Sequence, residues 1–159
     1  GHLIIVAHAM LNHRYEMLET IGQGTFGKVV KCIDLVDNRY VAIKIVRAIS
    51  KYSESAEIEI DILSKIQSRD PAGAKKCLQL LHHFKEKGHV CMVFPLYGPS
   101  LYDYMKQLNY RPFHYTDTWK IARQLLESLK FLHGMNLIHT DLKPENILLV
   151  EGDPITTAN

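Results

Sequence analysis

Short apolar runs between polar turn residues fill most of the first hundred residues and predict β-strands. Runs rich in β-branched and aromatic residues, separated by turn residues, predict strands at 15–21, 29–34 and 40–46. Two further strands are expected at 78–84 and 89–94. The front of the chain is therefore strand-rich.

One helical period interrupts these strands between residues 53 and 66. The apolar positions on one face of this expected helix are Ala56, Ile60 and Leu63. Ser53 is expected to cap it, and Asp70, next to a proline, to end it. The apolar opening, residues 1–7, lacks the basic residues of a targeting segment and is expected to be another strand.

The back third of the chain has a helical pattern. Ser100 and Asp103 form a capping box for a short helix over 101–108. Thr116 is expected to cap a longer helix that ends at Gly134. Its apolar face is Ile121, Ala122, Leu125, Leu129 and Leu132.

This order of elements predicts an α+β fold with two lobes. The strand-rich lobe with one helix would occupy residues 1–98, and a helical lobe would begin at residue 99 and run to 159. The hinge between them is expected near residues 95–99.

Composition narrows the classes of protein that this chain can represent. Of its 159 residues, 47% are hydrophobic and 23% charged, which is typical of a globular domain. The net charge of +2 gives no indication of direct nucleic-acid binding, and no apolar run approaches the ~18 residues of a membrane span. Three cysteines without C-x-x-C spacing argue against a disulfide framework and favour a reducing compartment, cytosol or nucleus. The nine histidines form no zinc pattern.

A glycine-rich segment follows the first predicted strand. Residues 22–29 read G-x-G-x-x-G-x-V, and glycines there let the backbone approach a phosphate chain without Cβ clashes. A hairpin turn that is merely rich in glycine is the plain alternative. A dinucleotide-binding fingerprint is the functional rival, but it needs a helix directly after the glycines, and here a strand continues.

Lys44 ends the apolar run Val41-Ala42-Ile43-Lys44. A lysine inside an apolar strand is costly to bury unless it is paired, and phosphate oxygens together with a carboxylate would satisfy it. The alternative is a lysine on an edge strand that points into solvent. Glu57, Glu59 and Asp61 on the predicted helix are candidate partners, and their spacing alone does not choose among them.

The segment at residues 138–146 reads Ile-His-Thr-Asp-Leu-Lys-Pro-Glu-Asn. In a loop, Asp141 can orient a hydroxyl, Lys143 can neutralise a transferring phosphoryl group, and Asn146 can hold a metal ion. Phosphoryl transfer depends mainly on positioning and charge stabilisation, so these residue types are sufficient for it.

Taken in order, these three motifs resemble the signatures of eukaryotic protein kinases. Within that superfamily the chain is similar to the LAMMER-type dual-specificity kinases. The likeness rests on Thr140, where most kinases have Arg, and on the stretches at 88–94 and 98–104. The resemblance covers essentially residues 1–150 and implies a protein-kinase-like fold.

The resemblance also implies an ATP site. The residues implied over the phosphates are Gly22, Gln23, Gly24, Thr25, Phe26 and Gly27. Those implied around the adenine are Ile21, Val29, Ala42 and Leu148, with Phe94 as gatekeeper and Pro95 and Tyr97 as backbone partners. Lys44 would hold the α- and β-phosphates with Glu59 as its helix partner, and Asp103 would lie near the ribose.

For catalysis, the resemblance makes Asp141 the base, Lys143 the γ-phosphate contact and Asn146 a ligand of Mg²⁺. The activity implied is ATP-dependent phosphorylation of Ser and Thr hydroxyls of proteins, with Tyr added by dual specificity. The family further implies Arg/Ser-rich splicing factors as substrates and a nuclear location.

Two departures from the family pattern qualify these expectations. Pro95 replaces the usual acidic hinge residue, but adenine would use its carbonyl, so binding should survive. No D-F-G or A-P-E motif occurs in the chain, so the second magnesium ligand is missing and the predicted C-terminal lobe is truncated. This chain alone is therefore expected to be inactive, and the alternative function is a non-catalytic nucleotide-binding or interaction module.

Overall fold

The computed structural model describes residues 1–150, which form two compact units. The first unit comprises Gly1–Gly73 and Leu78–Leu96. The second comprises Ala74–Cys77 and the residues from Tyr97 on. The tail at 152–159, on which the expected truncation partly rests, lies outside the described residues.

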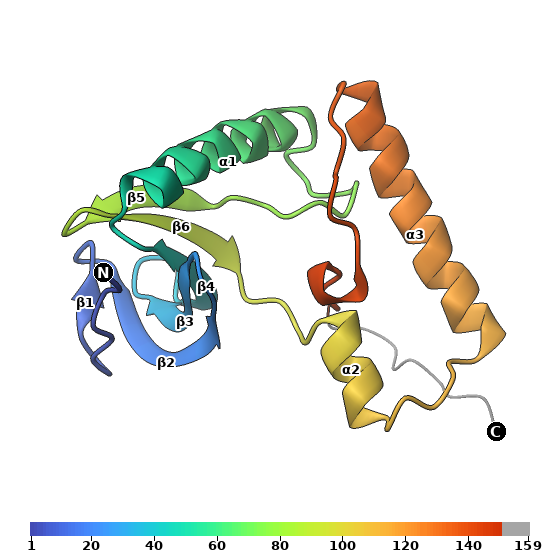
Figure 1. The fold of residues 1–159 in the computed structure, drawn as a ribbon, viewed down its shortest axis with the longest axis horizontal. Helices are drawn as coiled ribbons and strands as arrows, with labels where there is room; N and C mark the ends of the chain where they lie inside the picture. The colour runs from blue at the N-terminus through green and yellow to red at the C-terminus, as the bar shows by residue number, and fades with distance from the viewer. Residues whose placement is uncertain (151–159) are drawn as a thin grey trace. The chain divides into compact units, whose positions relative to one another are not determined.

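Within residues 1–150, six strands form one antiparallel sheet in the first unit, in the order β1-β2-β3-β4-β6-β5 (Figure 1). The strands are β1 (Met10–Leu11), β2 (Tyr15–Gln23), β3 (Gly27–Asp34), β4 (Arg39–Val46), β5 (His82–Glu86) and β6 (His89–Pro95). The α+β fold class is confirmed, as are the strands predicted at 15–21, 29–34, 40–46 and 89–94.

The strand predicted at residues 1–7 is wrong. Leu3 and Ile5 contact the hydrophobic core while Ile4 is 81% exposed, so the apolar alternation is real. The backbone bonds to β2 come instead from residues 8–11, where His8 N–H donates to the Met17 carbonyl at 2.8 Å. The strand expected at 78–84 also begins late, because the ladder with β6 starts at His82.

Helix α1 (Ser50–Arg69) begins earlier than predicted. Ser53 is not its cap: the helix begins at Ser50, and Ile49 occupies the cap position without a side-chain bond. The Ile49 carbonyl instead accepts from the backbone N–H groups of Tyr52 and Ser53. The predicted end is correct, since the Asp70 N–H donates to the Ile66 carbonyl and closes the last turn.

The second unit contains helix α2 (Leu101–Gln107), helix α3 (Tyr115–Gly134) and the 3₁₀ turn η1 (Pro144–Asn146). The Ser100 cap on α2 is confirmed. Thr116 is not the cap of α3, because the helix begins one residue earlier. The ring of His114 takes that role and accepts the Thr116 N–H at 3.4 Å.

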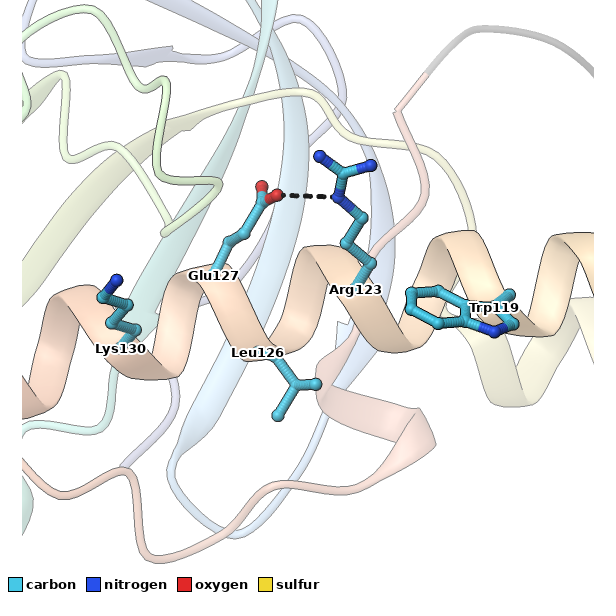
Figure 2. Close-up of a pocket in the computed structure, with 5 residues that line it drawn as sticks. All are labelled: Trp119, Arg123, Leu126, Glu127 and Lys130. Atoms are coloured by element: carbon cyan, nitrogen blue, oxygen red, sulfur yellow. Dashed lines mark hydrogen bonds and ion pairs between the residues drawn. The ribbon is translucent and has the colours of Figure 1, made fainter.

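The predicted apolar face of α3 is covered to different degrees. Leu132 is buried and Leu125 and Leu129 are half-buried, whereas Ala122 is exposed. Another face of the helix carries Trp119 and Leu126, which are about two-thirds exposed, beside the Arg123–Glu127 ion pair (Figure 2). In the described part of the chain, no helix has the length and apolar character needed to cross a bilayer.

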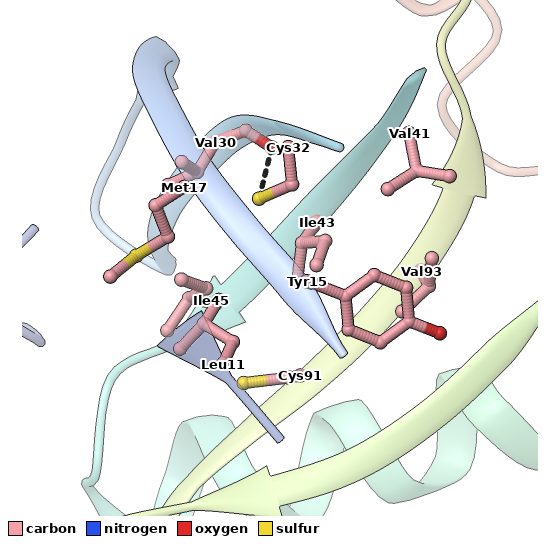
Figure 3. Close-up of a cluster of buried hydrophobic side chains, with 10 residues drawn as sticks. All are labelled: Leu11, Tyr15, Met17, Val30, Cys32, Val41, Ile43, Ile45, Cys91 and Val93. Carbon is pink, nitrogen blue, oxygen red and sulfur yellow. Dashed lines mark hydrogen bonds between the residues drawn. The ribbon is translucent and has the colours of Figure 1, made fainter. Parts of the chain in front are cut away.

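The main hydrophobic core lies on one side of the sheet of the first unit (Figure 3). Its buried members are Leu11, Tyr15, Met17, Val30, Cys32, Val41, Ile43, Ile45, Cys91 and Val93. The sheet curls around them, so that the Tyr15 ring stacks on Phe84 of the far strand at 5.7 Å between centroids. Burial raises the pKa of both Cys32 and Cys91 to about 12, which keeps the two thiols protonated.

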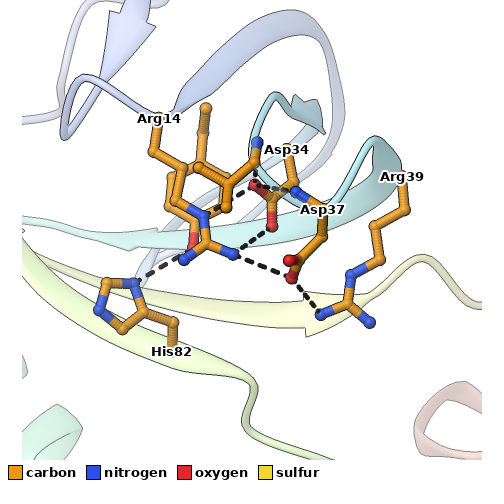
Figure 4. Close-up of polar contacts among 7 residues, drawn as sticks. Arg14, Asp34, Asp37, Arg39 and His82 are labelled. Atoms are coloured by element: carbon orange, nitrogen blue, oxygen red, sulfur yellow. Dashed lines mark hydrogen bonds and ion pairs between the residues drawn. The ribbon is translucent and has the colours of Figure 1, made fainter.

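A charged network closes the end of this sheet (Figure 4). Arg14 donates to both carboxylate oxygens of Asp34, at 2.7 Å each, and also to Asp37 at 2.9 Å. Asp34 is only 1% exposed. The hydrogen bonds from Arg14 lower the pKa of Asp34, so its carboxylate stays ionised at neutral pH. The network therefore fixes the turn before β2 to the end of β3.

Replacing Arg14 should expose how strongly the fold depends on this network. Arg14→Met leaves the buried Asp34 carboxylate without its cation, and losing one partner of a buried ion pair costs about 3–5 kcal/mol. We expect that loss in the free energy of unfolding measured by urea denaturation. Arg39→Met is the matched control: Arg39 pairs with the exposed Asp37, so this variant should lose less than about 1 kcal/mol. Equal losses for the two variants would contradict the interpretation.

Candidate functional site

Strand β4 carries the core on one side and the candidate site on the other. Val41, Ile43 and Ile45 are buried in the core, and side chains alternate along a strand. Ala42 and Lys44 therefore lie on the opposite face. Lys44 lies opposite Val29 of β3 and Met92 of β6, and Ala42 lies opposite Phe94 of β6. Residues directly opposite each other on neighbouring strands point to the same face of a sheet. Four residues singled out from the sequence thus share one face of the sheet.

Lys44 forms an ion pair with Glu59 of α1. Its Nζ lies 2.7 Å from Oε2 and 3.0 Å from Oε1 of that carboxylate. The two side chains are 23% and 39% exposed, so the pair is partly shielded from water. Glu57 instead pairs with Lys85 at 2.9 Å, and Asp61 is exposed. Of the three carboxylates that the helix pattern left open, the structure therefore places Glu59 on Lys44.

The glycine-rich segment is the turn between β2 and β3. Gly24 and Gly27 exchange backbone hydrogen bonds of 3.0 and 3.4 Å across it. The ring of Phe26 folds toward β4 and lies 5.0 Å from Lys44 Nζ, within the range of a cation–π contact. A Cβ atom on Gly24 would come within 2.8 Å of that ring, so the glycine makes room for it.

Gly27 is required for a second reason. Its φ of +154° falls in a region that side chains rarely adopt, and a Cβ there would lie 2.1 Å from the Ile45 carbonyl oxygen. The glycine therefore permits β3 to start directly against β4. Gly22, which pairs with Val29, is less constrained, because a Cβ there would make only an ordinary contact of 3.5 Å with Val29.

The remaining predicted residues of the first unit lie on or beside the same sheet. Ile21 in β2 is 48% exposed, Phe94 is buried at 8%, and Pro95 ends β6 opposite Val41. Gln23 and Thr25 are exposed, and the Thr25 carbonyl accepts from Arg47 at 3.4 Å.

Three predicted residues come together in the second unit around η1. Lys143 Nζ lies 3.1 Å from Asp141 Oδ2. The Asn146 amide nitrogen donates to the Asp141 carbonyl at 2.9 Å and to Oδ2 at 3.2 Å. The preceding residue, Thr140, has a φ of +66°, which is unusual for a β-branched residue and turns the chain sharply before Asp141. All three side chains are exposed.

Asp103 and Leu148 both lie next to Ser100 in the second unit. Backbone hydrogen bonds join residues 98–101 to residues 147–149, and Ser100 is registered with Leu148. Asp103 lies in the first turn of α2, where it is bonded to Ser100. Tyr97 begins the longer of the two segments that make up this unit.

The chemistry of Asn146 suits a hard cation. Its amide nitrogen is committed to Asp141, which keeps the amide oxygen as the ligand atom, and Mg²⁺ prefers oxygen ligands. Asp141 adds carboxylate oxygens next to it. Among residues 1–150, no group of three or more His, Cys, Asp or Glu side chains is arranged as a metal centre.

Sequence reasoning missed two contacts of this site. The Phe26 ring over Lys44 has a signal, an aromatic residue between two glycines, but its direction depends on the folded turn. The sequence predicts only a helix cap at Ser100, whereas its hydroxyl also donates to the Asp103 carboxylate at 2.7 Å.

Comparison with known proteins defines the class of this chain. The protein kinase domain family matches residues 15–156, and the chain belongs to that family. The resemblance to the LAMMER type is also confirmed. The chain is 46% identical over 154 residues to the dual specificity protein kinase CLK1 of Mus musculus, which covers 96% of this chain and 32% of that protein. It is 45% identical over 155 residues to the serine/threonine-protein kinase AFC1 of Arabidopsis thaliana, covering 98% and 33%.

A solved structure supports the same fold. A crystal structure of a kinase domain matches with a TM-score of 0.89 and 39% identity, covering 94% of this chain and 44% of that one. The chain spans about a third of the length of the two curated relatives, CLK1 and AFC1.

The two glycines at either end of the turn give a direct test of its geometry. Gly27→Ala should destabilise the fold by about 1–3 kcal/mol or more, because its Cβ collides with the Ile45 carbonyl. Gly22→Ala should change the unfolding free energy far less, since its Cβ meets Val29 at an ordinary distance. Urea denaturation of both variants measures the difference. A Gly27→Ala variant as stable as Gly22→Ala would show that β3 does not start as described.

Proposed function

We propose that this chain is the ATP-binding part of a protein kinase that transfers phosphate from ATP to Ser and Thr hydroxyls of proteins, and to Tyr by dual specificity. The observation that most supports the proposal is the grouping of Asp141, Lys143 and Asn146 around one short turn. These residue types serve a reaction that needs positioning and charge neutralisation more than covalent chemistry.

The first unit would supply the nucleotide contacts. Lys44, held by Glu59, would bind the α- and β-phosphates, and its charge is already compensated before any phosphate arrives. The turn from Gly22 to Gly27 would cover the phosphates, because its three glycines let the backbone approach without Cβ clashes, and the Phe26 ring would leave Lys44 Nζ as the phosphates bind. Ile21, Val29 and Ala42 would contact the adenine. Phe94 would be the gatekeeper, and the Pro95 carbonyl would accept from adenine.

The second unit would supply the catalytic groups. Asp141 would accept the proton of the substrate hydroxyl as that oxygen attacks. Lys143, which pairs with Asp141 in this structure, would turn its ammonium toward the transferred phosphoryl group and offset its charge. Asn146 would hold Mg²⁺, which neutralises phosphate charge when bound. Tyr97, Asp103 and Leu148 would contact the nucleotide from this unit.

The substrate class and the location are proposed from the family resemblance. The similarity to a protein named a dual specificity kinase supports phosphorylation of hydroxyls of more than one kind. We propose Arg/Ser-rich splicing factors as the substrates and the nucleus as the place of action, and both rest on the family resemblance alone. The division into an N-terminal lobe to residue 98 and a C-terminal lobe from residue 99 is proposed on the same basis.

Nucleotide binding is tested at Lys44. Lys44→Met should weaken ATP binding by roughly 1.5–3 kcal/mol, because a charge-assisted contact to phosphate is lost. Lys85→Met is the matched control: Lys85 also pairs with a carboxylate of α1, Glu57 at 2.9 Å, but the proposal gives it no contact with the nucleotide, so its loss should leave ATP affinity unchanged. Calorimetric titration with ATP measures both. Equal affinities in the wild type and Lys44→Met would sink the assignment.

Phosphoryl transfer is tested at Asp141 in a protein as long as the relatives. Asp141→Asn removes the base and should lower the turnover of an Arg/Ser-rich peptide by about 10²- to 10⁴-fold, with ATP binding retained. Radiolabelled phosphate incorporation measures turnover, and calorimetry measures binding. A variant with wild-type turnover would refute the role of Asp141. A wild type that binds ATP but transfers nothing would favour the non-catalytic alternative.

A further inference from the structure

The one aromatic ring of the glycine-rich turn lies against the ammonium of Lys44. The centroid of the Phe26 ring is 5.0 Å from Lys44 Nζ, within the ~6 Å range of a cation–π contact. Phe26 is half-buried, and its ring packs over Gly24, where a Cβ atom would lie 2.8 Å from the ring edge. The shape of the turn therefore holds the ring on the ammonium, and the ring does not extend into solvent.

The Lys44 ammonium has three hydrogen-bond donors, and its neighbours already surround it. The Glu59 carboxylate accepts through both of its oxygens, at 2.7 and 3.0 Å. The Phe26 ring covers a further side of the same nitrogen atom. A phosphate oxygen therefore competes with these two neighbours for the ammonium. Hydrogen bonds between two ionised groups are stronger than a cation–π contact, so the ring is the neighbour that gives way.

The backbone that carries the ring is bonded to Arg47, the residue that follows β4. The Phe26 carbonyl accepts the Arg47 N–H at 2.9 Å, and the Thr25 carbonyl accepts from the Arg47 guanidinium at 3.4 Å. The ring can leave Lys44 by rotation about its own side-chain bonds, and neither of these hydrogen bonds has to break. Removing the ring from the ammonium therefore costs the cation–π contact and not the structure of the turn.

We propose that Phe26 makes an autoinhibitory contact: its ring competes with the phosphates of a nucleotide for the Lys44 ammonium and so lowers the affinity of the chain for phosphate-bearing ligands. The inference rests on the proposed nucleotide binding and deepens it. A ring that instead folded over bound phosphates and strengthened their binding would have the opposite effect, because its removal would then weaken nucleotide affinity.

The experiment measures by calorimetry the affinities of the 159-residue chain for ATP, ADP and adenosine. Phe26→Leu removes the ring and keeps an apolar side chain. This variant should bind ATP and ADP about two- to fivefold more tightly than the wild type, because a cation–π contact no longer has to be broken. Its affinity for adenosine should not change, since adenosine has no phosphate that competes for Lys44. Phe26→Tyr keeps the ring and should bind ATP less tightly than Phe26→Leu.

Two further variants separate the ring contact from a general loosening of the turn. Adding Phe26→Leu to Lys44→Met should leave ATP affinity at the level of Lys44→Met, because no ammonium remains for the ring to release. Tyr52→Leu is the matched control: it removes a ring whose centroid lies 5.7 Å from the guanidinium of Arg47, which is bonded to the turn, and it should leave all three affinities unchanged. Circular dichroism checks that each variant is folded.

The failures are distinguishable. Weaker or unchanged binding of ATP by Phe26→Leu would overturn the inference, while Lys44-dependent ATP binding would still stand. An equal gain in affinity for adenosine would assign the effect to the site as a whole and would also overturn it. ATP binding that Lys44→Met does not weaken, or a wild type that binds none of the three ligands, would overturn the proposed function and this inference with it.

Discussion

The ion pair between Lys44 and Glu59 is the interaction on which the first unit's site depends. A lysine on an otherwise apolar strand needs a counter-charge, and α1 provides it from a single position on its inner side. The pair therefore fixes α1 to the sheet and also holds the Lys44 ammonium in place. Phe26 covers the same ammonium from the turn between β2 and β3, so strand, helix and turn converge on one nitrogen atom.

The sequence was sufficient for elements whose residue pattern is compatible with only one structure. Strands β2, β3, β4 and β6 followed from apolar runs between turn residues, and the Ser100 cap followed from the spacing to Asp103. Prediction failed where residues of the right type serve a different purpose from the expected one. Residues 1–7 are apolar and two of them contact the core, but residues 8–11, not these, bond to β2. The caps predicted at Ser53 and Thr116 are wrong because both helices begin earlier. In the sequence, a hydroxyl residue inside the first turn cannot be distinguished from one at the cap position.

The candidate site was predictable in kind and less so in arrangement. Glycines, a strand lysine and the Asp-x-Lys-x-x-Asn loop indicate phosphate chemistry by residue type. Helical spacing could not choose among Glu57, Glu59 and Asp61, because that choice depends on how α1 is rotated against the sheet. The direction of the Phe26 ring and the second bond of Ser100 depend on backbone positions that no local pattern specifies. Long-range geometry is what the sequence pattern leaves out.

The two-sided character of β4 has a consequence for how this chain tolerates change in length. Ile43 and Lys44 are neighbours, one completely buried and the other paired with α1. Deleting or inserting a single residue within the strand would exchange their faces, because side-chain direction alternates with a period of two. The ammonium would then enter the apolar interior and an isoleucine would meet Glu59. Many positions here can change by substitution. In contrast, inserting or deleting a single residue within β4 would disrupt the core and the site together.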